Sequence, residues 1–133
     1  MKRLLLEDDG HCFVCGKENG SGLGLDFSYQ DGKALCRFIP GKKHQGFRDI
    51  VHGGIIATVL DEAMMKIALA QGVEAVTAEV SVRFRNPLMV GDRSLVEAWI
   101  EKNGRKLIEA AARMKNADDT IIAEASSKLM KNA

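Results

Sequence analysis

A single helical stretch, apolar around most of its circumference, limits the folds that this chain can adopt. Residues 53–71 read GGIIATVLDEAMMKIALAQ and are followed by Gly72, a residue that commonly ends a helix. A helix that is apolar nearly all round is buried rather than exposed on a surface. Its apolar positions are Ile55, Ile56, Val59, Leu60, Ala63, Met64, Ile67 and Ala68. The rest of the chain must therefore cover this helix.

The segments on either side of the helix have the patterns of β-strands. Residues 23–30 and 34–39 are predicted strands before the helix, and residues 75–86, 94–101, 106–114 and 120–130 are predicted strands after it. Asp31-Gly32 and Asn103-Gly104 are strong signals for tight hairpin turns. One helix cannot cover both faces of so many strands, so we expect an α+β fold in which an antiparallel sheet curls around the helix.

Length and composition favour one globular domain. The 133 residues suffice for a single hydrophobic core, so residues 1–133 are expected to form one domain, with residues 1–21 as an N-terminal lead-in segment. A formal net charge of +1 argues against a nucleic-acid partner. The leading apolar run is too short for a signal peptide, and no run approaches the roughly 18 apolar residues that span a bilayer. We expect a cytoplasmic protein.

The start of the predicted helix has the chemistry of an oxyanion site. The first N–H groups of a helix are unpaired and carry partial positive charge, and glycine lets a ligand approach them closely. Gly53 and Gly54 could thus stabilise the charge that develops on a carbonyl under attack. His52 could contact the substrate or simply cap the helix. Taken alone, His-Gly-Gly also fits a plain turn from loop to helix.

Asp61 is the strongest candidate for the chemistry. It lies on a helix stripe of small or weakly polar residues, where a carboxylate is costly unless it is paired, solvated or functional. Glu62 has Lys66 four residues on as a surface ion-pair partner, whereas Asp61 has no such partner in the helix. A structural Asp61, hydrogen-bonded at an interface, is the alternative interpretation.

Three segments together resemble a known family. HGGIIATVLDEAM (residues 52–64), TAEVSVRFRNPLMVGD (residues 77–92) and the opening HCFVCGKENGSGLGLDF (residues 11–27) are similar to the hotdog-fold thioesterase superfamily, in particular to phenylacetate-pathway-type acyl-CoA thioesterases. The opening segment resembles a subgroup with a Cys-x-x-Cys-Gly-x-x-Asn lead-in. The resemblance implies a long central helix wrapped by a curved antiparallel sheet, and homodimers that pair into homotetramers with active sites between subunits.

The resemblance also implies roles for individual residues. Gly53 would donate its N–H to the thioester oxygen, Asp61 would act as general base or nucleophile, and Thr77 would orient the water. Many family members carry an Asn six residues before the His, where this chain has Gly46, so Gln45 is the substitute that we expect to contact the substrate.

Two further arguments come from the residues themselves. Eight residues separate Gly53 from Asp61, about 12 Å along a helix axis, so the two are expected to meet only across subunits. Arg83 and Arg85 share one strand face with Thr77 in the alternating pattern and could bind the phosphates of coenzyme A.

No cofactor or metal is expected. Cys12 and Cys15 are only half of a tetrahedral zinc site, and Cys36 or His44 would have to complete it. The leading hypothesis is therefore metal-free hydrolysis of an acyl-CoA thioester. Hydration or dehydration of an acyl thioester through Asp49 and His52, and non-catalytic acyl-CoA binding, remain open alternatives.

Overall fold

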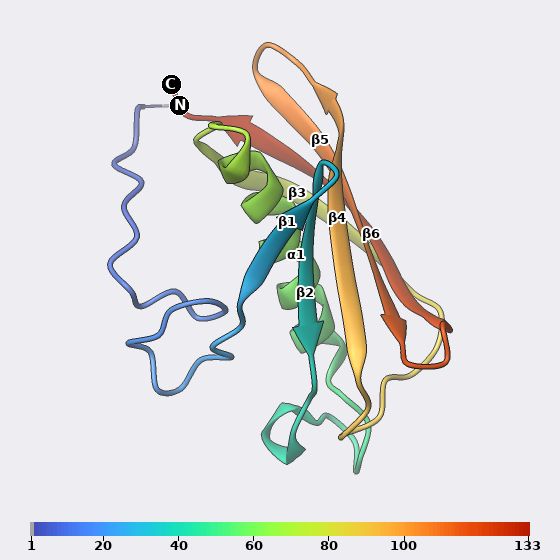
Figure 1. The fold of residues 1–133 in the computed structure, drawn as a ribbon. Helices are drawn as coiled ribbons and strands as arrows, with labels where there is room; N and C mark the ends of the chain where they lie inside the picture. Colours follow the sequence, from blue (N-terminus) through green and yellow to red (C-terminus); the bar gives the residue numbers. More distant parts are fainter. Residues whose placement is uncertain (1) are drawn as a thin grey trace.

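The computed structural model describes residues 2–133, which form one long helix packed against a six-stranded antiparallel sheet (Figure 1). The elements in chain order are β1 (Phe27–Gln30), β2 (Lys33–Phe38), the 3₁₀ turn η1 (Lys42–His44), α1 (Gly53–Ala70), β3 (Ala75–Phe84), β4 (Ser94–Asn103), β5 (Leu107–Asn116) and β6 (Ile121–Lys131). The strand order is β1-β2-β4-β5-β6-β3, so β1 and β3 are the edges. The predicted α+β fold, a long helix wrapped by a curved sheet, is confirmed.

The predicted Asp31-Gly32 turn and the predicted helix end are found. Asn103-Gly104 lies at a hairpin as predicted but forms no tight two-residue turn, because β4 ends at Asn103, β5 begins only at Leu107, and neither Asn103 nor Gly104 has a positive φ. Asp31 and Gly32 have φ of 53° and 74°, the left-handed values that a tight two-residue hairpin requires. Gly72 has φ of 80° just beyond α1, where glycine ends a helix at low cost. The predicted first strand is too long, because residues 23–26 pair with the lead-in segment instead. The N–H of Leu23 donates to the carbonyl of Phe13 at 2.8 Å.

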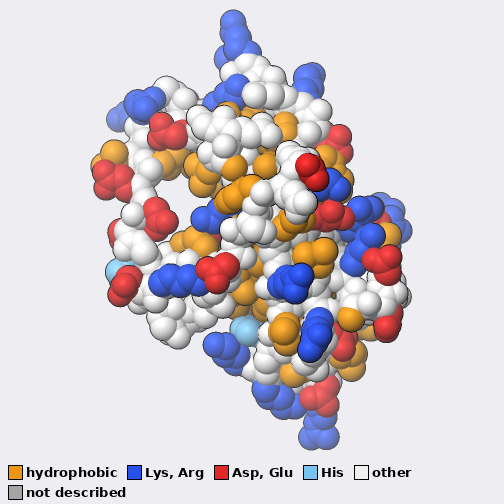
Figure 2. Space-filling view, in the orientation of Figure 1, with side chains coloured by type: hydrophobic (Ala, Val, Ile, Leu, Met, Phe, Trp, Pro, Cys, Tyr) orange, Lys and Arg blue, Asp and Glu red, His pale blue; other side chains and the backbone are white. Residues whose placement is uncertain are grey.

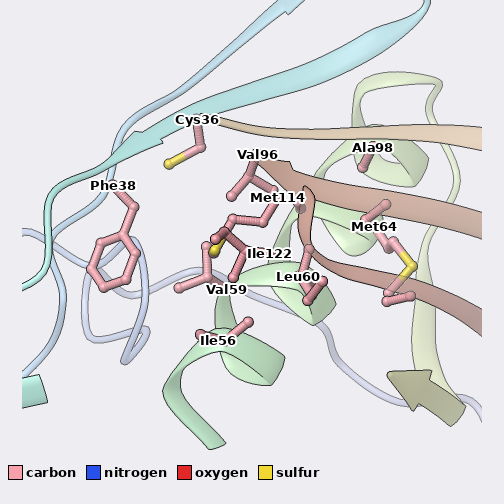
Figure 3. Close-up of a cluster of buried hydrophobic side chains, with 14 of the residues drawn as sticks. Cys36, Phe38, Ile56, Val59, Leu60, Met64, Val96, Ala98, Met114 and Ile122 are labelled. Atoms are coloured by element: carbon pink, nitrogen blue, oxygen red, sulfur yellow. The ribbon is translucent and has the colours of Figure 1, made fainter. Parts of the chain in front are cut away.

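The hydrophobic core lies between one face of α1 and the inner face of the sheet (Figure 3). Its fully buried members come from the helix and from four strands: Cys36, Phe38, Val59, Leu60, Met64, Val96, Ala98, Met114 and Ile122. The opposite side of the helix is only half-buried, and Leu69 is 47% exposed there. The prediction that α1 is buried around its whole circumference was therefore wrong for a single chain, because the curved sheet covers only one face of the helix.

The lead-in segment, here residues 2–21, contains no helix or strand and arches away from the body (Figure 1). Its start is tied to the end of β6: Leu4 and Asn132 exchange two hydrogen bonds of 2.8 Å, and Arg3 donates to the carbonyl of Ala133 at 2.8 Å. Figure 2 shows the opening that remains between this segment and the body. No helix in residues 2–133 is long and apolar enough to cross a membrane.

Candidate active site

A bulge in β3 turns Thr77 toward the helix. β3 pairs with β6, and the register skips Ala78: Thr77 pairs with Leu129, and Glu79 with Lys128. Neighbouring residues of β6 point to opposite faces, so Thr77 and Glu79 do as well. Uninterrupted alternation would have put Thr77 on the face of Arg83, and that expectation was wrong. Thr77 instead shares the face of buried Leu129, which points toward α1.

Asp61 and Thr77 meet on this face. The hydroxyl of Thr77 donates a hydrogen bond of 2.8 Å to Oδ1 of Asp61. Burial raises the pKa of the Asp61 carboxyl above its usual range, the Thr77 hydrogen bond opposes this, and the neighbouring charge of Glu62 adds to it. Asp61 is thus a half-buried carboxylate held in one orientation, with a pKa shifted toward the range useful for a base.

Asp61 and Thr77 open into a cavity of about 710 Å³ between α1, the start of β3 and the lead-in segment. The apolar part of its wall comes from all three: Leu5, Leu6, Met65, Leu69, Ala75 and Val76. Its polar part contains His11, Cys12, Cys15, Glu62 and Lys66 beside Asp61. The cavity therefore offers an apolar compartment next to a carboxylate.

The helix start offers one free backbone donor. Nδ1 of His52, the N-cap residue, accepts a 2.8 Å hydrogen bond from the N–H of Gly54. The capping role of His52 is therefore the one observed, and the Gly54 N–H is occupied. The N–H of Gly53 makes no hydrogen bond within residues 2–133. Of the two predicted glycine donors, only Gly53 remains available to a ligand.

Gly53 lines a second cavity, of about 290 Å³, together with Phe84, Arg85 and Asn86. The ring of Phe84 lies 3.4 Å from where a Cβ on Gly53 would be, and this aromatic wall was not predicted. Arg85 is engaged by Glu124, with Nε and Oε1 3.2 Å apart, while Arg83 is exposed.

The loop before the helix uses Gln45 for support. Oε1 of Gln45 accepts a hydrogen bond of 3.0 Å from the backbone N–H of Asp49. The carboxylate of Asp49 forms a salt bridge of 2.9 Å with Lys42. Asp49 and His52 thus have separate partners and form no acid–base pair of the kind that a hydratase needs. Gly46 packs against His52, whose Cα would lie 3.4 Å from an added Cβ.

Asp61 and Gly53 are not brought together within one chain. They line two different cavities, and the eight helical steps between them hold them about 12 Å apart along the axis of α1. A single chain therefore presents the candidate base and the candidate oxyanion donor at two separate places.

The sequence interpretation of Glu62 was wrong. No salt bridge joins Glu62 to Lys66 among the described residues; instead the thiol of Cys12 donates to Oε2 of Glu62 at 2.9 Å. Cys15 lies beside them, and Sγ of Cys12, Sγ of Cys15 and a Glu62 carboxylate oxygen are all within 4.8 Å of one another. The spacing of Cys12 and Cys15 indicated the pair, but only the fold could bring Glu62 to it.

Comparison with known proteins agrees with this architecture. The family model of the thioesterase superfamily matches residues 49–123. The acyl-coenzyme A thioesterase THEM5 of Mus musculus is 26% identical over 126 residues, covering 94% of this chain and 47% of that protein. The chain thus spans about half the length of this relative.

Two solved structures share the fold. The smu.793 protein from Streptococcus mutans bound to acetyl-CoA superposes with a TM-score of 0.78 at 21% identity, over 82% of this chain and 89% of that one. The PaaI protein of the Escherichia coli phenylacetic acid degradation operon superposes with a TM-score of 0.76 at 21% identity, over 80% and 82%.

Proposed function

The chain belongs to the thioesterase superfamily, and on that premise we propose that it hydrolyses an acyl-CoA thioester to a free acid and coenzyme A. The observation that carries the proposal is Asp61: a half-buried carboxylate with a raised pKa, oriented by Thr77 and facing a partly apolar cavity. Named relatives are acyl-CoA thioesterases, and one structure of this fold contains acetyl-CoA.

The reaction needs only groups that the chain supplies. As general base, Asp61 removes a proton from water, whose oxygen attacks the thioester carbonyl carbon. The carbonyl oxygen becomes an oxyanion, which the Gly53 N–H stabilises. The C–S bond then breaks, and the proton held by Asp61 passes to the departing sulfur. As nucleophile, Asp61 would instead attack the carbonyl carbon, the C–S bond would break to release coenzyme A as its thiolate, and water would hydrolyse the resulting mixed anhydride to the free acid and the Asp61 carboxylate.

Because Gly53 and Asp61 of one chain lie too far apart, we propose that they come from different subunits. The surface available for a second copy is edge strand β3 and the open side of α1. Val80 and Phe84 point to the inner face of β3 yet are 41% and 51% exposed. Large apolar side chains grouped on an unpaired edge favour an interface between copies. A homodimer, or a tetramer of paired dimers, would cover them.

The two cavities suggest how a substrate would lie. The acyl group would enter the cavity beside Asp61, where Leu5, Leu6 and Leu69 supply apolar surface. Coenzyme A would extend past Gly53 of the other subunit, where Arg85 lines the same cavity and could meet its phosphates. Arg83 does not line this cavity and lies on the face of β3 opposite Phe84, so it would meet a phosphate only beyond the cavity. Oε1 of Gln45 is occupied by the N–H of Asp49, so Gln45 would contact the substrate through its amide nitrogen.

Two broader expectations also stay predictions. One is that residues 1–133 act as a single domain whose lead-in segment belongs to the active site. The other is a cytoplasmic location, which rests on an odd number of cysteines without a disulfide framework.

The test is an acyl-CoA panel, from acetyl to long-chain and aromatic groups, assayed for both release of the CoA thiol and loss of the thioester. Hydrolysis releases one thiol for each thioester lost, whereas hydration of an unsaturated acyl group releases none and simple binding consumes nothing. The protein's own three cysteines need a substrate-free blank.

Asp61→Asn is expected to lower kcat/KM by about 10²–10⁴-fold. Full activity in that variant would reject Asp61 as base or nucleophile.

A further inference from the structure

Two thiols and a carboxylate form a cluster beside Asp61, and the proposed hydrolysis uses none of the three as base, nucleophile or oxyanion donor. Cys12 and Cys15 come from the lead-in segment, and Glu62 comes from the middle of α1, fifty residues further along the chain. All three side chains are partly buried, and one ligand atom of each lies within 4.8 Å of the other two. The fold thus brings together three side chains of metal-binding types from two distant segments of the chain.

The turn that carries the cysteines is built to present both sulfurs on one side. The N–H of Cys15 points to Sγ of Cys12 at 3.5 Å, and the N–H of Gly16 donates to the carbonyl of Cys12 at 2.9 Å. A Cβ on Gly16 would lie 2.5 Å from the Cys12 nitrogen, so only glycine allows so tight a turn.

We propose that Cys12, Cys15 and Glu62 bind one zinc ion, which fastens the lead-in segment to α1. Two thiolates and one carboxylate suit Zn²⁺, which takes sulfur at about 2.3 Å and carboxylate oxygen at about 2.0–2.2 Å in a tetrahedron. Ligand atoms in such a tetrahedron lie about 3.5–3.8 Å apart, so small side-chain rotations complete the site from the present arrangement. Water is the fourth ligand.

Binding is balanced in protons and charge. The two thiols release their protons to solvent as the ion enters, including the one that Cys12 now donates to Glu62. Zn²⁺ with two thiolates and one carboxylate carries one net negative charge. Lys66, on the next turn of α1 beside Cys15, supplies the compensating positive charge. The expected absence of metal assumed that Cys36 or His44 had to complete the site. Cys36 is instead buried in β2, and His44 packs on Phe38.

Elemental analysis tests the proposal on the full chain, purified without chelator and with a phosphine reductant that keeps the thiols free. About one zinc per chain is expected. Cys12→Ser, Cys15→Ser and Glu62→Gln each preserve side-chain shape while removing one ligand, and each should lose most of the zinc. Cys36→Ala is the matched control, because it removes the third cysteine thiol from the core and should leave zinc content unchanged.

Two measurements keep the proposal open to refutation if a variant fails to fold. Wild-type protein stripped with chelator should gain thermal stability when zinc is restored. Cobalt in place of zinc should give the near-ultraviolet absorption of a thiolate–cobalt bond. Zinc far below one per chain, with no thiolate–cobalt band and no thermal shift, would overturn the proposal and leave Cys12–Glu62 as a hydrogen-bonded anchor. Neither measurement depends on thioesterase activity.

Discussion

At the scale of single residues, Asp61 is a group whose ionisation opposes folding. Its pKa is raised by burial, so the folded chain holds the Asp61 proton to higher pH than the unfolded chain does. Well below the Asp61 pKa of the unfolded chain, about 4, the Asp61 carboxyl is protonated in both the folded and the unfolded chain. As the pH rises from there through the pKa of the folded chain, the protein loses folding free energy. At neutral pH the carboxylate therefore costs folding free energy.

Replacing Asp61 by Asn should consequently stabilise the protein while inactivating it. Asn keeps the volume and can still accept the hydrogen bond from Thr77, but it never ionises. Urea unfolding at pH 7 should give Asp61→Asn a higher free energy of unfolding than the wild type, and the difference should shrink toward zero below about pH 4. A less stable Asn variant at pH 7 would mean that the charged carboxylate is a structural element, favoured by its Thr77 hydrogen bond.

Thr77 acts on the chemistry through Asp61, as a positioning residue. Its hydrogen bond favours the carboxylate, so Thr77→Val, a change of nearly equal shape, should raise the Asp61 pKa further. The rising limb of kcat/KM against pH should move to higher pH. The plateau at high pH should fall by roughly tenfold or less, as expected for loss of one hydrogen bond. A lower plateau with an unmoved midpoint would contradict this role.

At the scale of the elements, the start of α1 can be tested by removing one N–H. Gly53 is the first helical residue, where proline is well tolerated, and His52 has φ of −61° and ψ of 129°, the extended backbone that a residue before proline needs. Gly53→Pro should therefore fold, yet lower kcat by about 10²–10³-fold, because it deletes the oxyanion donor.

Gly53→Ala is the matched control for this change. It adds a Cβ at the same place, 3.4 Å from the Phe84 ring, but keeps the N–H. Its kcat should stay well above that of Gly53→Pro, with similar melting temperatures for both. Equal losses in the two variants would show that crowding against Phe84, rather than loss of the donor, causes the defect.

The elements themselves could largely be predicted from the sequence, because each depends on a local pattern. The helix followed from apolar residues over 53–71, and the positions of two hairpins followed from Asp31-Gly32 and Asn103-Gly104. Only Asp31-Gly32 forms the tight turn that its residues predict. The bulge at Ala78 could not be predicted, since nothing local distinguishes it from regular alternation. It arises from pairing with β6 and reverses the side to which Thr77 points. Glu62 was misjudged for the same reason: its partner Cys12 is fifty residues away.

At the scale of the whole molecule, our proposal makes the active site a property of the assembly, because Asp61 and Gly53 are separated within one chain. The spacing along the helix predicted the separation of Asp61 and Gly53, and the two residues line two separate cavities. The surface that we propose for self-association includes Val80 and Phe84, and these two residues could not be singled out from the sequence, because their exposure depends on β3 being an edge strand. Light scattering should find no active monomer, and Val80→Lys should weaken self-association and lower activity together.

The decisive experiment mixes two inactive variants, Asp61→Ala and Gly53→Pro, by co-expression or by joint unfolding and refolding. If each site takes Asp61 from one subunit and Gly53 from the other, a mixed dimer contains one site with both defects and one intact site. Random pairing of equal amounts puts about half of the dimers in the mixed form, so the mixture should recover roughly a quarter of wild-type activity. Different affinity tags on the two variants allow mixed dimers to be isolated, and these should show about half of wild-type activity. Isolated mixed dimers as inactive as their parents would rule out the shared site and require Asp61 and Gly53 to act within one chain, against the geometry of α1.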